Sequence, residues 1–303
     1  MEREGFMNRV IIKARDGYPL NLHIFEVENP KGYVQIIHGM EEHQERYEPL
    51  VERLNAAGYA VVSSDMRGHG ETAPVLGYFG ESGGWRSLLT DQIRITSYIR
   101  MRYQVEKVIL FAHSMGTIIA RNLLQSQSKY YGKVILSGYP SANSAAGFGI
   151  ILTGMIQKWK GGDYYSKLIQ KLAIGTFNRK IYDHKTDLDW ISVNEDNVQA
   201  FIDDPYCGHG FRIAGFRDLF RLVQRMTKVH LYRNVQADLP ILAIRGAEDP
   251  CTGGIQGSNA SLLLLQKAGF THIASICYTG MRHEILNEND NEQVYIDILE
   301  FLG

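Results

Sequence analysis

Short apolar runs rich in β-branched residues alternate with helical periodicity along most of the chain. VIIKA and LHIFEV are expected to form an antiparallel hairpin around DGYPL, where Gly17 and Pro19 suit a turn. After this hairpin the apolar runs are continuous, which is typical of parallel strands covered by helices on both faces. The pattern predicts an α/β fold with a mostly parallel central sheet flanked by helices.

Six parallel strands are expected, at residues 33–38, 59–65, 107–112, 133–138, 239–246 and 271–278. Helical patterns occupy most of the intervals between them, at 46–58, 85–103, 115–127 and about 256–268, and a last helix ends at Leu302. From about 139 to 235 the alternation stops, and helical patterns with aromatic residues replace it. We therefore predict a core of residues 1–138 and 236–303, with a helical cap inserted at 139–235.

Two serines match, or nearly match, the G-x-S-x-G pattern of a hydrolase nucleophile. Ser82 in GESGGW matches strictly, but it follows a loop-like segment and no buried strand leads into it. Ser114 in FAHSMG has Ala112 at the first glycine position, yet it lies between an expected strand and an expected helix. That strand, turn and helix form the setting of a nucleophile elbow. We predict that Ser114 is the nucleophile and that Ser82 is a loop residue.

A serine needs a base to take its proton and a carboxylate to hold that base in the right tautomer. On such a sheet these partners follow the serine in the order acid, then histidine, each at the carboxyl end of a later strand. Asp249 in RGAEDP and His283 in GMRHEILNE have these positions. Glu248 is expected to point elsewhere in its turn, and His272 precedes its strand and so lies at the wrong end.

The negative charge that develops on the substrate oxygen is usually met by two backbone N–H groups. The first is expected from Met115, directly after the nucleophile. The second is expected from Met40 in IIHGMEEH, because Gly39 lets the chain turn sharply after its strand. His38 is interpreted as a polar support of this loop.

These segments resemble the α/β-hydrolase superfamily, and within it the branch of monoacylglycerol lipases and lysophospholipases, also described as a serine-aminopeptidase-like domain. The resemblance covers nearly the whole chain and is carried by HGMEEHQERY, DMRGHGET, AHSMG, RGAEDP and YTGMRHEILNE. It implies Ser114 as nucleophile, with Asp249 and His283 as its partners, and the Met40 and Met115 amides as oxyanion donors. The stretch 189–208 resembles the cap of that branch.

The cap begins with SANSAAGFGIILTGMIQKW, which has no charge before Lys158. One interpretation is a wall for an acyl chain, with Phe148 and Ile151, beside Gly39 of the oxyanion loop, as substrate-binding residues. The other is plain packing on the core. If the first holds, enlarging Gly149 or Gly154 to Phe is expected to change the preferred acyl length.

Composition and charge indicate which kinds of partner and cofactor the protein is expected to lack. The 303 residues carry a formal charge of −1, which provides no field for nucleic acid. No apolar stretch approaches the roughly 20 residues of a membrane span, and the three cysteines form no paired framework, so a soluble cytoplasmic protein with buried thiols is expected. The ten histidines are scattered without ligand spacing, and we predict no metal and no other cofactor.

A helical segment at 215–226 places arginines at positions 217, 221 and 225 on one side. This face is either a solvated surface or a site of peripheral contact with anionic lipid.

The function expected is therefore a serine ester hydrolase acting on monoacyl lipids. The alternatives are a short-chain soluble esterase or peptidase of the same fold, and a binding protein without activity.

Overall fold

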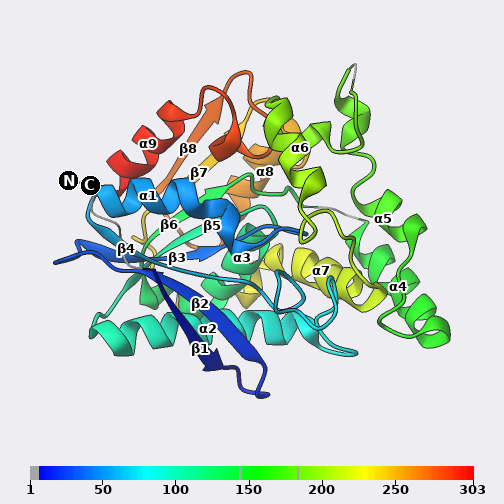
Figure 1. Ribbon diagram of the computed structural model, residues 1–303, viewed down its shortest axis with the longest axis horizontal. Coiled ribbons are helices and arrows are strands. Elements are labelled where there is room, and N and C mark those ends of the chain that lie inside the picture. Colours follow the sequence, from blue (N-terminus) through cyan, green and yellow to red (C-terminus); the bar gives the residue numbers. More distant parts are fainter. Residues whose placement is uncertain (1–6, 143–144, 183) are drawn as a thin grey trace.

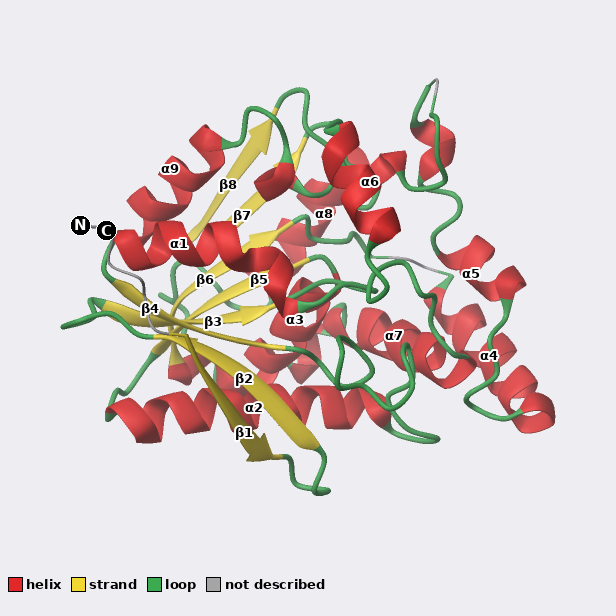
Figure 2. Cartoon of the chain, in the orientation of Figure 1, coloured by secondary structure: helices red, strands yellow, loops and turns green. Residues whose placement is uncertain are grey.

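The computed structural model describes residues 7–142, 145–182 and 184–303. Its centre is an eight-stranded sheet in the order β1-β2-β4-β3-β5-β6-β7-β8 (Figure 2). The strands are β1 Met7–Lys13, β2 Pro19–Phe25, β3 Gly32–Ile37, β4 Tyr59–Ser64, β5 Val108–His113, β6 Tyr131–Ser137, β7 Ile241–Gly246 and β8 Ile273–Tyr278. β2 runs antiparallel to both β1 and β4, and the remaining neighbours are parallel. The predicted hairpin and the mostly parallel sheet are confirmed.

Helices cover both faces of this sheet (Figure 1). They are α1 Glu48–Ala56, α2 Gly84–Tyr103, α3 Met115–Gln127, α4 Ala146–Lys160, α5 Lys167–Ala173, α6 Glu195–Asp203, α7 Ile213–Met226, α8 Gly254–Lys267 and α9 Glu292–Leu302. α1 and α9 share one apolar core with the sheet, and α2, α3 and α8 share the core on the other face.

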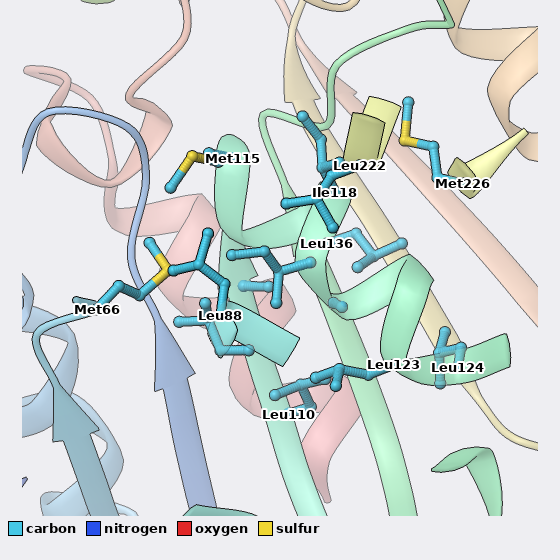
Figure 3. Close-up of a cluster of buried hydrophobic side chains, with 14 of the residues drawn as sticks. Met66, Leu88, Leu110, Met115, Ile118, Leu123, Leu124, Leu136, Leu222 and Met226 are labelled. Atoms are coloured by element: carbon cyan, nitrogen blue, oxygen red, sulfur yellow. The ribbon is translucent and has the colours of Figure 1, made fainter. Parts of the chain in front are cut away.

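The central strands supply side chains to both cores because successive residues of a strand point to opposite faces. In β5, Leu110 and Ala112 belong to the core under α2 and α3, whereas Phe111 belongs to the core under α1 and α9. Figure 3 shows part of the core under α2 and α3, where Leu222 of α7 lies beside Ile118 of α3. The continuous apolar runs of the sequence reflect this burial on both faces.

Between residues 139 and 235, the described part of the chain contains α4, α5, α6 and α7 and contributes no strand to the sheet. α7 is fastened to the core: the side chain of Asn122 donates to the Leu222 carbonyl (3.0 Å), and that of Gln125 donates to the Arg225 carbonyl (2.9 Å). α4 packs along α7. The helical character expected here is present, and the division of the chain into core and cap stays a prediction.

The cysteines differ in burial more than the sequence suggested. All three thiols are free, but only Cys207 is buried; Cys251 is partly exposed and Cys277 is exposed. The prediction was wrong for Cys277 because it lies on β8, the edge strand, whose residues are mostly accessible.

Candidate active site

Ser114 occupies a tight turn between the end of β5 and the start of α3. Its φ of 50° and ψ of −118° lie in a region that residues with a side chain rarely adopt. The turn is held by the Ser114 N–H, which donates to the Ser137 carbonyl at 2.9 Å. Gly116 is needed because a Cβ there would lie 2.3 Å from the carbonyl oxygen of Ile37. Strain of this kind is retained at functional sites.

Asp249 and His283 meet Ser114 at the carboxyl edge of the sheet. His283 Nε2 lies 2.8 Å from Ser114 Oγ, and His283 Nδ1 lies 2.9 Å from Asp249 Oδ2. Asp249 follows β7 and His283 follows β8, so parallel neighbours bring residues far apart in sequence to one point. The structure thus places together all three residues predicted for the triad.

The hydrogen bonds define how this cluster can move a proton. Asp249 accepts from His283 Nδ1–H, which leaves Nε2 free to accept the Ser114 hydroxyl proton. Burial lowers the pKa of His283, but the carboxylate of Asp249, together with those of Glu284 and Glu42, outweighs it, and the pKa is raised above its ordinary value. Asp249 is oriented in turn by the Cys251 N–H, which donates to Oδ1 at 2.8 Å.

The loop after β3 approaches Ser114 closely. A Cβ at Gly39 would lie 2.5 Å from Glu42 Oε1 and 3.1 Å from the Ser114 Cβ, so a side chain there would force its neighbours to shift. Met40 and Met115 both line the space in front of the serine, and Met115 is the first residue of α3, where a backbone N–H has no partner within the helix. Both positions suit the predicted oxyanion role.

The side chain of His38 connects the loop after β3 to the loop after β4 by hydrogen bonds. Its Nε2 accepts from the Met66 N–H at 2.9 Å, so Nδ1 carries the proton and donates to the Gly39 carbonyl at 2.8 Å. Complete burial lowers the pKa of His38 to about 3, and the ring is neutral at ordinary pH. His38 has the geometry of the support that the sequence suggested.

A buried ionic cluster that the sequence analysis missed lies behind the loop. Arg46 donates to Glu284 at 2.6 and 2.8 Å and to Glu42 at 3.0 Å. Glu42 also accepts from the Gly39 N–H and from the Tyr47 hydroxyl. Burial raises the pKa of Glu284, but Arg46 outweighs it and sets the pKa at about 2. This cluster ties the oxyanion loop to the residue that follows His283.

A cavity of about 320 Å³ opens in front of Ser114. Its polar end is formed by the serine, His283, the loop after β3 and Glu284. Its other walls are apolar and come from α3, α4, α5, α7 and the segment around Trp190; they include Ile118, Ala146, Ala173, Ile174, Phe177, Leu188, Trp190, Ile191, Leu219, Phe220 and Val223. Such a cavity can hold an apolar group with its reactive end at the serine.

Two of the predicted substrate contacts are wrong. Phe148 is 66% exposed and Ile151 is 61% exposed, and neither lines the cavity, whereas Gly39 and Ala146 do. α4 is apolar on most of its sides, so the sequence did not show which side faces inward. The lining residues Phe177 and Trp190 were missed; the ring of Trp190 lies 5.0 Å from that of His283.

The weaker candidates of the sequence lie outside the site. Ser82 is an exposed loop residue before α2, Glu248 is exposed, and His272 is exposed before β8. Neither Cys207 nor His209 is among the lining residues.

Among the residues that the structure describes, two groups of three bring possible metal ligands within 4.8 Å of one another: His43, Asp204 and Cys207, and Asp249, Cys251 and His283. In each group the histidine and the aspartate are already hydrogen bonded to one another, at 2.8 and 2.9 Å. Burial raises the pKa of both cysteines, which keeps the thiols protonated. The chemistry of these groups therefore favours hydrogen bonding over metal binding.

Comparison with known proteins agrees with this geometry. The family described as serine aminopeptidase, S33, matches residues 28–290. A monoacylglycerol lipase of Mycolicibacterium smegmatis is 28% identical over 285 residues, which cover 90% of this chain and 89% of the relative. Phospholipase YtpA of Bacillus subtilis is 23% identical over 273 residues, 89% of this chain and 95% of the relative.

Among solved structures, a thermostable carboxyl esterase of Bacillus coagulans in complex with glycerol superposes with a TM-score of 0.90 at 25% identity. The match covers 98% of this chain and 97% of the esterase. With the family match over most of its length, the chain is a serine ester hydrolase of the α/β-hydrolase fold and belongs to the serine aminopeptidase S33 family.

Proposed function

We propose that this hydrolase cleaves the ester bond of monoacyl lipids by a two-step acyl transfer at Ser114. The observation that carries the proposal is the position of the Ser114–His283–Asp249 chain at the polar end of a cavity whose other walls are apolar. An acyl chain in the apolar part would present its ester carbonyl to the serine.

In the first step His283 Nε2 takes the Ser114 proton while Oγ attacks the ester carbonyl. Asp249 stabilises the imidazolium that forms, because its carboxylate already accepts from Nδ1–H. The Met40 and Met115 N–H groups stabilise the negative oxygen. His283 then gives its proton to the departing alcohol, which leaves an acyl-enzyme.

In the second step water replaces the alcohol and the same groups act again. His283 takes a proton from the water, which attacks the acyl carbonyl, and the proton then returns to Ser114 as the fatty acid leaves. The relatives agree with this substrate class in name, since one is a monoacylglycerol lipase and another a phospholipase.

The proposal is tested by fatty-acid release from monoacylglycerols and lysophospholipids at short, medium and long acyl length, with Ser114→Ala as the blank. We expect release from medium and long chains of at least one of these two lipid classes, and no release by the variant. Release confined to the shortest chains would contradict the proposal and make the protein a soluble esterase. Covalent labelling of Ser114 by a fluorophosphonate would separately test its reactivity.

We also propose contact with a lipid surface, through α4 and α5 instead of α7. The three arginines of the predicted α7 face are partly buried: Arg217 donates to Gln157 Oε1, Arg221 lies 3.8 Å from Asp218, and Arg225 donates to Gln125 Oε1. They offer no open cationic face.

Exposed apolar side chains lie instead on α4 and α5, two of the helices that line the cavity. We call this set the α4–α5 patch; it comprises Phe148, Ile151, Met155, Trp159, Leu168 and Leu172. Trp159 is 86% exposed and Leu168 is 62% exposed. Lysines on the same two helices, 158, 160, 167 and 171, are exposed and would meet anionic headgroups.

A further inference from the structure

The charged groups that line the cavity are all of one sign. Glu41, Glu42 and Glu284 line it, and among the described residues no lysine or arginine does. Two of these carboxyl groups are balanced, because Glu42 and Glu284 share the Arg46 guanidinium at 2.6 to 3.0 Å. Glu41 has no such cationic partner among the residues that the structure describes.

Glu41 is held by neutral groups alone. Its two carboxyl oxygens accept from Gln170 Nε2 of α5, at 2.9 and 3.2 Å, and its carbonyl accepts from the Gly208 N–H at 3.0 Å. The residue is 4% exposed and has a φ of 58°, a left-handed conformation that costs energy for a residue other than glycine. It directly follows Met40 of the predicted oxyanion pair.

We propose that Glu41 is a specificity-determining residue, whose ionised carboxyl group restricts the enzyme to esters of uncharged alcohols and excludes those whose alcohol carries a phosphate. The inference rests on the proposed function. An anionic headgroup beside Ser114 would meet an uncompensated carboxylate in a water-poor site, where like charges repel strongly. A free hydroxyl at the same place would meet a hydrogen-bond acceptor with unused capacity.

The exclusion is expected to depend on pH. Burial raises the pKa of Glu41 to about 7, against smaller lowerings by the hydrogen bonds from Gln170 and from the Gly210 backbone. Below that pH the group is protonated and the repulsion is lost, and above it the repulsion is complete.

The groups around Glu41 come from α5, from the loop after α6 and from its own loop. On α5, Gln170 is uncharged, and Lys167 and Lys171 are exposed. In the loop after α6, burial lowers the pKa of His209, which stays neutral at pH 7.

The other charged neighbours of Glu41 are hydrogen bonded to other groups. Arg212 donates to the Leu76 carbonyl. In Glu41's own loop, His43 is hydrogen bonded to Asp204 and Glu42 to Arg46.

The test compares kcat/KM for a monoacylglycerol with that for lysophosphatidylglycerol of the same medium-length acyl chain, both below their critical micelle concentrations. The phosphodiester keeps one charge throughout, and the ratio of the two values cancels the titration of His283. For the wild type we expect the ratio to rise about tenfold or more between about pH 5.5 and about pH 8.5, with a midpoint near the Glu41 pKa.

Three variants separate this role from a structural one. In Glu41→Gln, which keeps the shape, the ratio is expected to be low and independent of pH. In Gln170→Met the midpoint should move to higher pH, since a hydrogen bond that lowers the Glu41 pKa is lost. Glu45→Gln removes the same charge from the same loop at a side chain that is 50% exposed and outside the cavity, and should match the wild type.

A wild-type ratio that is flat with pH, or a Glu41→Gln variant that keeps the wild-type dependence, would overturn the inference while leaving the proposed function in place. A lack of monoacylglycerol turnover at every pH would overturn the proposed function, and the inference with it. Should Glu41→Gln fail to fold, the wild-type ratio and the Gln170→Met midpoint still decide the matter.

Discussion

At the scale of single residues, His283 is subject to two opposed effects. Burial disfavours its charged form, whereas the adjacent Asp249 carboxylate, with Glu284 and Glu42 farther off, favours that form and raises the pKa overall. A general base must be uncharged to act, so activity falls as the pH falls through the raised pKa. For an uncharged short-chain ester we expect the acid limb of kcat/KM to lie above the ordinary histidine pKa of about 6.5.

Asp249→Asn tests this cause directly. With the carboxylate gone, burial remains, so the pKa of His283 should fall and the acid limb should move to lower pH. The plateau of kcat should drop by about ten-thousand-fold, as expected when the tautomer is no longer fixed. A pH profile measured with a fluorogenic ester gives both numbers. An unchanged limb would mean that Asp249 does not set the pKa of His283.

The turn at Ser114 allows a second prediction, on stability. In Gly116→Ala the new methyl would collide with the backbone oxygens of Ile37 and His38, at 2.3 and 2.7 Å, which cannot move cheaply. We expect a loss of about 3 kcal/mol in the free energy of unfolding, typical of severe overpacking. Urea unfolding measures it.

Gly132→Ala is the matched control, because its Cβ would make an ordinary contact 3.6 Å from the Lys107 side chain. That change should leave stability equal or raise it by about 0.5–1 kcal/mol. Equal losses in both variants would contradict the steric explanation.

At the scale of elements, the packing of α4 on α7 connects α4 to the cavity. A Cβ at Gly149 would lie 2.6 Å from the ring of Phe220, which lines the cavity. A Cβ at Gly154 would instead lie 3.4 Å from the Arg217 guanidinium. The two glycines share one helix, but only Gly149 reaches the cavity wall, and it does so through Phe220.

Gly149→Ala is therefore expected to push Phe220 into the cavity and shorten the space for an acyl chain. We predict that kcat/KM for long-chain esters falls about tenfold relative to that for short-chain esters. A tenfold change requires the loss of only about 1.4 kcal/mol of binding free energy between the acyl chain and the cavity wall. Gly154→Ala, with the same gain in helix propensity, should keep the wild-type chain-length profile. If both variants keep it, Phe220 does not bound the acyl site.

These elements also show what a sequence can and cannot predict. The strands were predicted closely because burial on both faces demands continuous apolar runs, as in β5. α4 was predicted as a helix, yet Phe148 was assigned inward and lies outward, because an apolar helix carries no signal of which side is covered. Its orientation depends on where Phe220 and Arg217 of α7 lie.

At the scale of the whole molecule, the same contrast holds for the site. Ser114, Asp249 and His283 were predictable because each follows a strand, and the carboxyl ends of parallel strands share one edge of the sheet. Arg46 and Glu284 are 238 positions apart, and neither carries a local pattern that names its partner. Ion pairs between distant loops become visible only once the loops are placed.

The distribution of apolar surface over the molecule leads to the last prediction. No helix of the described residues is long and apolar enough to cross a membrane. The α4–α5 patch lies on helices that also form the cavity wall, through Ala146 and Ala173. A lipid surface against this patch would bring monoacyl substrate to the cavity.

Replacing Trp159 and Leu168 together by Ser should reduce binding to anionic liposomes by about tenfold or more, because each large apolar side chain contributes about 1.5–3 kcal/mol when it leaves water. Binding of the wild type should also weaken with salt, since the lysines of α4 and α5 act through screened charge. Met101→Ser on α2, a residue that is 76% exposed, is the matched control and should bind as the wild type does. Co-sedimentation measures all three proteins, and hydrolysis of a monomeric ester should be the same in each. Equal binding by the double variant would remove the α4–α5 patch as the docking surface without affecting the chemistry at Ser114.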